Sequence, residues 1–256
     1  MTTISFAAKV ETLQIYSPSM KKNIKCVVVK PKKIKSNLPV VYLLHGYSDN
    51  YASWVEGFDT KELVDKYKVI AVSPDGAYSS WYLDSPVDST MRYETFISKE
   101  LVSYIDNNYQ TIRHRNARAI TGLSMGGHGA LYNAIRNKNV FGAAGSMSGG
   151  VDIIPFPENW DLSKRLGPID SNLENWKAHT VMTQIENLQP GELELIIDCG
   201  VDDFFFEVNE KLHRRLLEKK ISHRYITDKG EHNITYWRKA QHYHFLFFSQ
   251  YFNNNH

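Results

Sequence analysis

The chain has 256 residues, of which 42% are hydrophobic and 12% aromatic, and its formal net charge is +2. This length and apolar content fit one α/β domain with a substantial core better than two small domains. Charges of both signs are interspersed, with no basic block of the kind that binds nucleic acid. No apolar run approaches the length that spans a membrane. Neither nucleic acid nor a membrane is therefore expected as a partner.

The first 44 residues predict three strands. Residues 11–16 alternate polar and apolar side chains, as a half-buried strand does, and residues 24–29 predict a second strand. A proline-containing break at 17–19 separates the two, so they predict an antiparallel hairpin at a sheet edge. Residues 38–44 are continuously apolar, which is typical of a central strand buried on both faces.

The rest of the chain alternates predicted strands and helices. Further strands are predicted at 69–73, 116–120, 142–150, 193–199 and 223–227. Helices are predicted at 60–66, 91–108, 131–136, 208–219 and 236–251. This alternation predicts the α/β class, a mostly parallel sheet with helices on both faces, in one domain over 1–256. Residues 152–190 hold four prolines and are the least regular part, which predicts a lid inserted over a site.

The N-terminus and the two cysteines bear on the compartment. Residues 1–10 lack the charged start and the apolar centre of a signal peptide, so the chain as written predicts a cytoplasmic protein. The small residues of 6–8 are typical of the end of a cleaved leader, and a leader removed before Met1 would make the protein periplasmic or secreted. Cys26 and Cys199 lie in apolar runs and are expected to be buried free thiols, with one disulfide left open.

Residues 121–130 carry the strongest functional motif, Thr-Gly-Leu-Ser-Met-Gly-Gly-His-Gly-Ala. A predicted strand precedes it and a good helix former follows, which is the context of the Gly-x-Ser-x-Gly nucleophile elbow. A serine on such a sharp turn needs neighbours with almost no side chain, and Gly122 and Gly126 meet that need. Ser124 is therefore the candidate nucleophile, and an incidental glycine-rich turn is the alternative.

A serine hydroxyl needs an adjacent base, and the base needs a carboxylate that orients it. In α/β-hydrolases these follow in the order Ser, Asp or Glu, His, each on a loop after a strand. Asp202 and Asp203 both follow the predicted strand 193–199, and the spacing alone does not choose between them. His232 follows the last predicted strand in a glycine-containing loop and fits the base.

Five other histidines fit the base less well. His45 and His128 precede or flank the elbow, and His213 lies within a predicted helix. His242 and His244 lie in the last predicted helix, where residues two apart point in different directions and no acidic or cysteine partner accompanies them. The sequence therefore predicts neither a metal site nor another cofactor.

Two further segments suggest parts of an acyl-transfer site. The strand 38–44 ends in a His-Gly pair, where the backbone can offer an N–H to an oxyanion, with a second from the residue after the nucleophile. The candidate donors are the amides of Tyr47 and Met125, and an ordinary strand-end turn is the alternative. Trp81 and Tyr82 follow a predicted strand and are expected either to line a substrate pocket or to cap the core.

Five segments form a recognisable set, at 42–46, 81–86, 122–130, 199–204 and 230–232. Together they resemble one esterase branch of the α/β-hydrolase superfamily. That branch includes esterase D or S-formylglutathione hydrolase, tributyrin-type esterases, a group of bacterial feruloyl esterases and the mycobacterial mycolyltransferases. The resemblance extends from about Val10 to Phe252 and implies the α/β-hydrolase fold.

The resemblance also assigns roles to residues. In the family pattern Gly-x-x-Asp the acid stands three residues after the glycine, which implies Asp203 rather than Asp202. The family histidine corresponds to His232, and the family oxyanion donors correspond to the amides of Tyr47 and Met125.

The resemblance implies a serine carboxylesterase that forms an acyl-enzyme intermediate and acts on a small-molecule or oligosaccharide ester. The Trp-Tyr-x-Asp-Ser-Pro loop at 81–86 looks like that of esterases from gut polysaccharide degraders, so acetyl or feruloyl esters of plant polysaccharides are expected. Residues 45–49 differ from the formylglutathione enzymes, and S-formylglutathione hydrolysis is an alternative. Acyl transfer on the same triad and a non-catalytic carbohydrate-binding module are further alternatives, and a homo-oligomer is left open.

Overall fold

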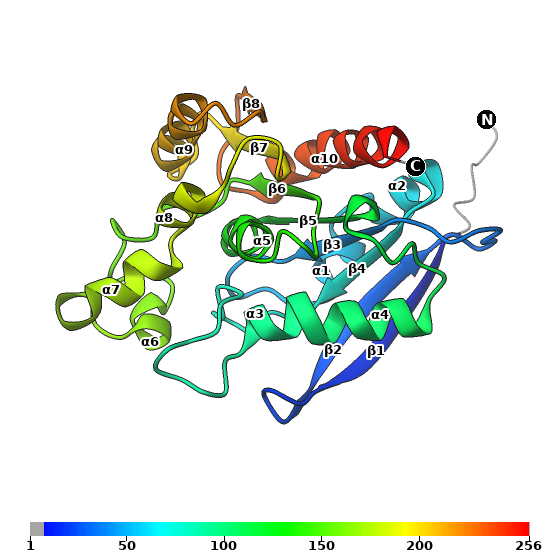
Figure 1. The fold of residues 1–256 in the computed structure, drawn as a ribbon, viewed down its shortest axis with the longest axis horizontal. Coiled ribbons are helices and arrows are strands. Elements are labelled where there is room, and N and C mark those ends of the chain that lie inside the picture. The colour runs from blue at the N-terminus through cyan, green and yellow to red at the C-terminus, as the bar shows by residue number, and fades with distance from the viewer. Residues whose placement is uncertain (1–7, 256) are drawn as a thin grey trace.

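The computed structural model describes residues 8–255 and is built on an eight-stranded sheet of order β1-β2-β4-β3-β5-β6-β7-β8 (Figure 1). The strands are β1 (Lys9–Ser17), β2 (Lys22–Lys30), β3 (Val40–Leu44), β4 (Ile70–Pro74), β5 (Arg118–Leu123), β6 (Ala143–Met147), β7 (Glu194–Gly200) and β8 (Arg224–Asp228). The hairpin β1–β2 and the pair β2–β4 are antiparallel, and the other neighbouring strands are parallel. The predicted edge hairpin and the mostly parallel α/β sheet are confirmed.

The central strands separate two layers of core. β3 is buried at every residue, and its successive side chains point to opposite faces of the sheet. Tyr42 and Leu44 join the core on one face, and Val41 and Leu43 join the core on the other. A strand buried on both faces must be apolar throughout, which is why this segment carries no alternation in its sequence.

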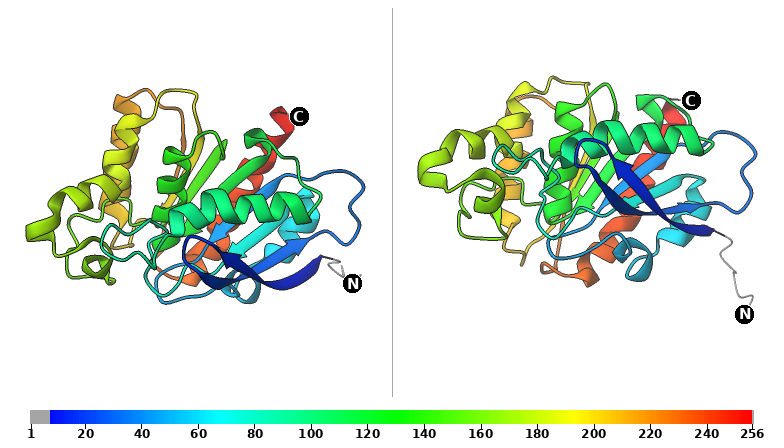
Figure 2. Two further views of the ribbon diagram at one scale, coloured as in Figure 1. Left: turned by 60° about the horizontal axis from the view of Figure 1, so that its bottom comes forward. Right: turned by 90° about the horizontal axis from the view of Figure 1, so that it is seen from below.

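Helices cover both faces of the sheet (Figures 1 and 2). The first face carries α3 (Tyr93–Thr95), the π-helical turn Phe96–Leu101, α4 (Val102–Asn108), α5 (Met125–Arg136) and α9 (Phe206–Glu218). The second face carries α1 (Ser53–Glu56), α2 (Thr60–Tyr67) and α10 (Ile234–Asn254). The helix running from α3 through α4 lies over the β1–β2 end of the sheet, as both figures show.

Two element boundaries differ from expectation around the elbow. β5 begins at Arg118, two residues later than predicted, because Arg115–Ala117 forms a 3-10 turn held by the His114 side chain. α5 begins at Met125, directly after Ser124, and therefore earlier than the predicted helix. The change from strand to helix is thus completed at one residue.

The segment 152–190 is more helical than its sequence suggested. It contains α6 (Leu162–Leu166), α7 (Ile169–His179), α8 (Val181–Gln184) and the 3-10 turn Ile185–Asn187. Within α7, Asn172 has non-helical dihedral angles, so the periodic pattern is interrupted. These helices project beyond the edge of the sheet beside α5 and α9 (Figure 1).

Two further sequence expectations concern the cysteines and the N-terminus. Cys26 and Cys199 are free and buried, as predicted. The interpretation of 6–8 as the end of a leader lies, except for Ala8, outside the described residues. Among residues 8–255, no helix is both long enough and apolar enough to cross a bilayer.

Candidate active site

Ser124 occupies the junction between β5 and α5 and has a strained backbone, with φ 54° and ψ −118°. Such a conformation is costly for a residue with a side chain and is typical of functional turns. A Cβ at Gly122 would overlap the backbone of Gly126, and one at Gly126 would overlap the carbonyl of Leu44. Both glycines are therefore required by close backbone approach, as the elbow interpretation predicts.

The structure brings Ser124, His232 and Asp203 into one hydrogen-bonded row. His232 Nε2 lies 2.9 Å from Ser124 Oγ, and Nδ1 lies 3.0 and 2.9 Å from Asp203 Oδ1 and Oδ2. Because the carboxylate accepts from Nδ1–H, Nε2 is free to accept the serine proton. The Asp203 side chain is fully buried, and that of His232 is 15% exposed.

The sheet topology explains why residues so far apart in the sequence meet. Ser124 follows β5, Asp203 follows β7 and His232 follows β8, and these strands are parallel. The carboxyl ends of parallel strands share one edge of the sheet, so the three loops converge there. Asp202 is exposed, and its backbone amide donates to the Gly230 carbonyl at 3.0 Å. The geometry thus places Asp203, not Asp202, against the histidine.

The loops that carry the acid and the histidine are joined by close contacts. A Cβ at Gly200 would overlap the Gly230 carbonyl, so the two loops approach backbone to backbone. The ring of Tyr236, at the start of α10, packs against Gly230, and its hydroxyl donates to Asp198 on β7. Burial raises the pKa of Asp198 to about 7.

The His-Gly turn after β3 lies beside Ser124. Leu44 pairs with Gly122 in the sheet, and a Cβ at Gly46 would lie 3.6 Å from Ser124 Cβ. Within residues 8–255, the amides of Tyr47 and Met125 have no protein acceptor. Both amides are therefore free to donate to an acceptor outside the described chain.

Aromatic side chains surround the triad on the side of the acid loop. The Phe204 ring lies 4.2 Å from the His232 ring, centroid to centroid, and Trp160 stacks on Phe204 at 5.8 Å. Phe204 is 56% exposed, so the stack presents an open aromatic face beside the histidine. Sequence reasoning missed both residues, although the run of three phenylalanines directly after Asp203 was a usable signal.

A second aromatic group stands at the turn that follows β3. The rings of Tyr47 and Tyr78 meet edge to face at 4.8 Å, and Tyr78 is 59% exposed. Desolvation, with smaller contributions from Tyr78 and Asp161, raises the pKa of the Tyr47 hydroxyl to about 12. The segment 152–190 thus reaches the site twice, through Trp160 at Phe204 and through Asp161 at Tyr47.

A cavity of about 400 Å³ lies beside the Trp237 side chain. Leu123, which precedes the nucleophile, lines it together with Phe58 and Trp237. The Trp237 ring also meets the His232 ring edge to face at 4.8 Å. Asp49 and Glu56 also line this cavity, so it is of mixed polarity, and among the described residues His232 does not line it.

Of the two expectations for Trp81 and Tyr82, the structure supports the one in which they cap the core. Their exposures are 1% and 0%, so neither lines an open pocket. Trp81 meets the His128 ring at 5.3 Å, and its indole N–H donates to the Trp160 carbonyl at 3.1 Å. Tyr82 lies so close to Gly129 of α5 that a Cβ there would be 2.6 Å from its ring.

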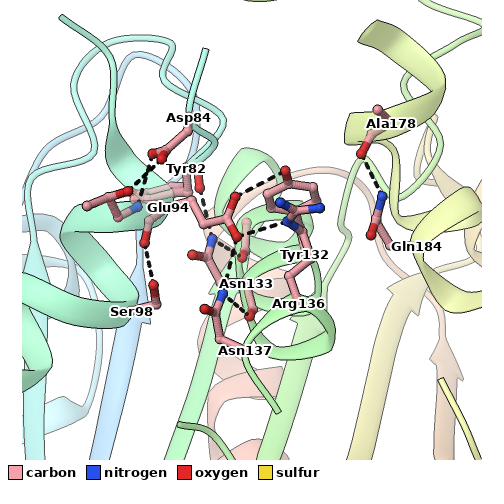
Figure 3. A network of polar contacts seen from close by, with 12 residues as sticks. Tyr82, Asp84, Glu94, Ser98, Tyr132, Asn133, Arg136, Asn137, Ala178 and Gln184 are labelled. Carbon is pink, nitrogen blue, oxygen red and sulfur yellow. Dashed lines mark hydrogen bonds and ion pairs between the residues drawn. The ribbon is translucent and has the colours of Figure 1, made fainter. Parts of the chain in front are cut away.

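A polar network fixes the 81–86 loop to its neighbours (Figure 3). Asn133 of α5 donates to the Tyr82 carbonyl at 2.9 Å. Asp84 accepts from the amide of Thr95 at 3.0 Å and from its hydroxyl at 2.6 Å, so it holds the end of α3. The Trp-Tyr-x-Asp-Ser-Pro segment therefore links α3 to α5 through hydrogen bonds.

The two histidines of α10 make different contacts. His242 Nε2 lies 2.9 Å from Asp59 Oδ2 near the surface, whereas His244 is buried with Nδ1 2.8 Å from Thr121 Oγ1. Burial lowers the pKa of His244 to about 3. Within the described chain, no group of three His, Cys, Asp or Glu side chains is arranged to hold a metal ion.

Comparisons with known proteins agree with this architecture. The fold is that of the α/β-hydrolases. A family model described as "Putative esterase" matches residues 17–242, so the chain belongs to this esterase family. It is a carboxylic-ester hydrolase.

Individual relatives cover nearly the whole chain. An acetyl esterase of Caldicellulosiruptor saccharolyticus is 28% identical over 249 residues, which are 89% of this chain and 93% of the relative. A solved structure of a ferulic acid esterase matches 97% of this chain and 100% of its own, with a TM-score of 0.82 and 27% identity. An S-formylglutathione hydrolase from Agrobacterium tumefaciens covers 98% of both chains with a TM-score of 0.84 at 21% identity, a likeness of fold.

Proposed function

We propose that this esterase works through an acyl-enzyme intermediate on Ser124, with His232 as base and Asp203 as the carboxylate that orients it. The observation that carries the proposal is the unbroken row of hydrogen bonds from Asp203 through His232 to Ser124. The buried carboxylate holds the proton on Nδ1 and stabilises the imidazolium that forms during reaction.

The reaction then proceeds in two halves. Ser124 Oγ attacks the ester carbonyl while its proton passes to His232 Nε2, and a tetrahedral oxyanion forms. The imidazolium gives that proton to the leaving alcohol as the C–O bond breaks, which leaves the acyl group on the serine. A water molecule then attacks the acyl carbonyl as its proton passes to His232 Nε2, and the imidazolium returns that proton to Ser124 Oγ as the bond between the acyl carbon and Oγ breaks and the acid leaves. The amides of Tyr47 and Met125 donate to the oxyanion in both halves.

We further propose acetyl or feruloyl esters of plant polysaccharides as the substrates. The acetyl esterase and the ferulic acid esterase among the relatives support this class. Because His232 protonates the leaving alcohol, groups beside it contact the alcohol part of the ester. The exposed Phe204–Trp160 stack lies there and offers a flat apolar surface to a sugar ring.

The test is hydrolysis of an ester panel by the wild type and by Ser124→Ala. The panel holds p-nitrophenyl acetate, methyl ferulate, acetylated xylan and S-formylglutathione. We expect serine-dependent turnover of ferulate or acetylated xylan, and loss of essentially all activity in the folded Ser124→Ala variant. Retained activity in that variant would contradict the mechanism. Preference for S-formylglutathione, or faster acyl transfer to an added sugar than to water, would replace the proposed substrate class.

A further inference from the structure

His45 is a buried histidine that takes no part in the triad. It directly follows β3, has 0% exposure, and both of its ring nitrogens lie within hydrogen-bonding distance of the backbone. The Gly76 amide donates to Nε2 at 2.7 Å, and Nδ1 lies 2.8 Å from the Gly46 carbonyl oxygen. The ring therefore ties the end of β3 to the loop that follows β4.

These two contacts decide where the proton of the ring lies. A backbone amide can only donate, so Nε2 must be the accepting nitrogen. The neutral ring then carries its proton on Nδ1, which donates to the Gly46 carbonyl. Burial lowers the pKa of His45 and favours this neutral form, while the hydrogen bond to Gly46 and the charges of Asp75 and Asp49 act in the opposite direction.

The Gly46 carbonyl belongs to the same peptide unit as the Tyr47 N–H. The peptide unit is planar, and its C=O and N–H point in opposite directions. A hydrogen bond that fixes the direction of the carbonyl therefore fixes the direction of the amide. Donation to the carbonyl oxygen also polarises the peptide, which makes its N–H a stronger donor.

We propose that His45 is a positioning residue for the oxyanion hole, holding the Gly46–Tyr47 peptide so that the Tyr47 N–H faces the oxyanion formed at Ser124. The inference rests on the proposed function, in which that amide stabilises the oxyanion. Its geometric basis is the Nδ1 contact to Gly46 together with the position of Gly46 beside Ser124.

Tyr82 secures the backbone of the same residue. Its hydroxyl donates to the His45 carbonyl at 3.1 Å, and the two rings meet edge to face at 5.8 Å. Tyr82 adopts a left-handed φ of 56°, which a large side chain takes only where its surroundings enforce it. His45 is thus held through its ring by Gly46 and Gly76, and through its main chain by Tyr82.

The test compares His45→Asn with His45→Gln in the full chain. The asparagine amide lies near the position of Nδ1 and can donate to the Gly46 carbonyl. The glutamine amide reaches the position of Nε2 and can accept from Gly76 but not serve Gly46. Loss of a whole oxyanion donor costs about 10²- to 10³-fold in kcat. A misdirected donor should cost less than a missing one, so we expect His45→Gln to lower kcat on p-nitrophenyl acetate by at least about tenfold with KM nearly unchanged. His45→Asn should lower kcat clearly less.

A second readout separates positioning from general damage. Affinity for a trifluoromethyl ketone, which forms a tetrahedral adduct with the serine, should fall in each variant in proportion to kcat/KM. Equal losses in the two variants, or losses confined to KM, would overturn the proposal. If neither variant folds, Tyr82→Phe removes only the bond to the His45 carbonyl and should lower kcat several-fold at constant KM. Unchanged kcat in that variant would also overturn it.

The outcomes also separate this inference from the mechanism on which it rests. If Ser124→Ala is inactive while both His45 variants keep the wild-type kcat, the role of His45 is wrong and the triad stands. If Ser124→Ala retains activity, the proposed function fails, and the inference about the oxyanion hole fails with it.

Discussion

Replacing Asp203 by asparagine should disable the base without disturbing the fold. The amide of Phe205 donates to Asp203 Oδ1 at 2.8 Å, so the carbonyl oxygen of the asparagine would take that place. Its NH₂ group would then replace Oδ2, the atom that lies 2.9 Å from His232 Nδ1. A donor facing Nδ1 makes that nitrogen the acceptor and moves the ring proton to Nε2. The histidine could then no longer accept the proton of Ser124.

The size of the loss follows from this change of tautomer. A wrong tautomer in a serine triad costs about 10⁴-fold in kcat. That factor corresponds to about 5.4 kcal/mol of activation free energy. The matched control is Asp202→Asn, because Asp202 is the adjacent carboxylate and is exposed. It should change kcat by less than about twofold, since surface substitutions usually have small effects.

The assay is steady-state hydrolysis of p-nitrophenyl acetate at pH 7 to 8, with thermal unfolding of each variant measured beside it. Equal losses in the Asp203 and Asp202 variants, or the reverse order, would show that the row of hydrogen bonds does not define the acid. A Tm for Asp203→Asn far below that of the wild type would show that the loss reflects unfolding instead of chemistry.

Two further predictions concern stability and specificity. Burial raises the pKa of Asp198 to about 7, above its value of about 3.9 in an unfolded chain. The folded state thus keeps a proton that the unfolded chain releases, and stability falls by up to about 1.4 kcal/mol per pH unit as pH rises from about 4 to 7. Asp198→Asn should therefore have the higher Tm at pH 8 and match the wild type near pH 4; an unchanged pH dependence of Tm would contradict this. Trp160→Ala removes the stack on Phe204, so KM for acetylated xylan should rise, by at most about tenfold. The kcat/KM for p-nitrophenyl acetate, which has no sugar, should stay within about twofold. Equal effects on both substrates would contradict a role of Trp160 in binding the sugar.

The elements that the sequence predicts well are those whose own residues determine them. A strand buried on both faces is apolar throughout, as β3 is, whereas a strand buried on one face alternates polar and apolar residues, as β1 does. Each pattern therefore identifies its strand. The elbow is equally local, since Gly122, Ser124 and Gly126 lie within five positions. The acid required more, because the spacing alone does not choose between two adjacent aspartates, and the family pattern had to supply Asp203, the residue that faces His232 in the folded turn after β7.

The remaining features depend on contacts between distant segments. The Trp160–Phe204 stack joins residues from the 152–190 segment and the acid loop, and no pattern near either residue specifies the pairing. The helices of that segment are short, and α7 is interrupted at Asn172, so their periodicity is weak. Trp81 and Tyr82 were ambiguous for a similar reason, since an aromatic pair in a loop can face solvent or core until its neighbours are known.

The two buried cysteines make the protein well suited to chemical labelling. Burial raises the pKa of Cys26 and of Cys199, and the thiolate is the form that reacts with maleimides. The chain contains no other cysteine. A single cysteine introduced at an exposed position would therefore be the one reactive thiol of the folded enzyme. Placed at Leu173 on α7, which is 42% exposed, it would carry a fluorophore that reports on the 152–190 segment while the native sulfurs stay unmodified.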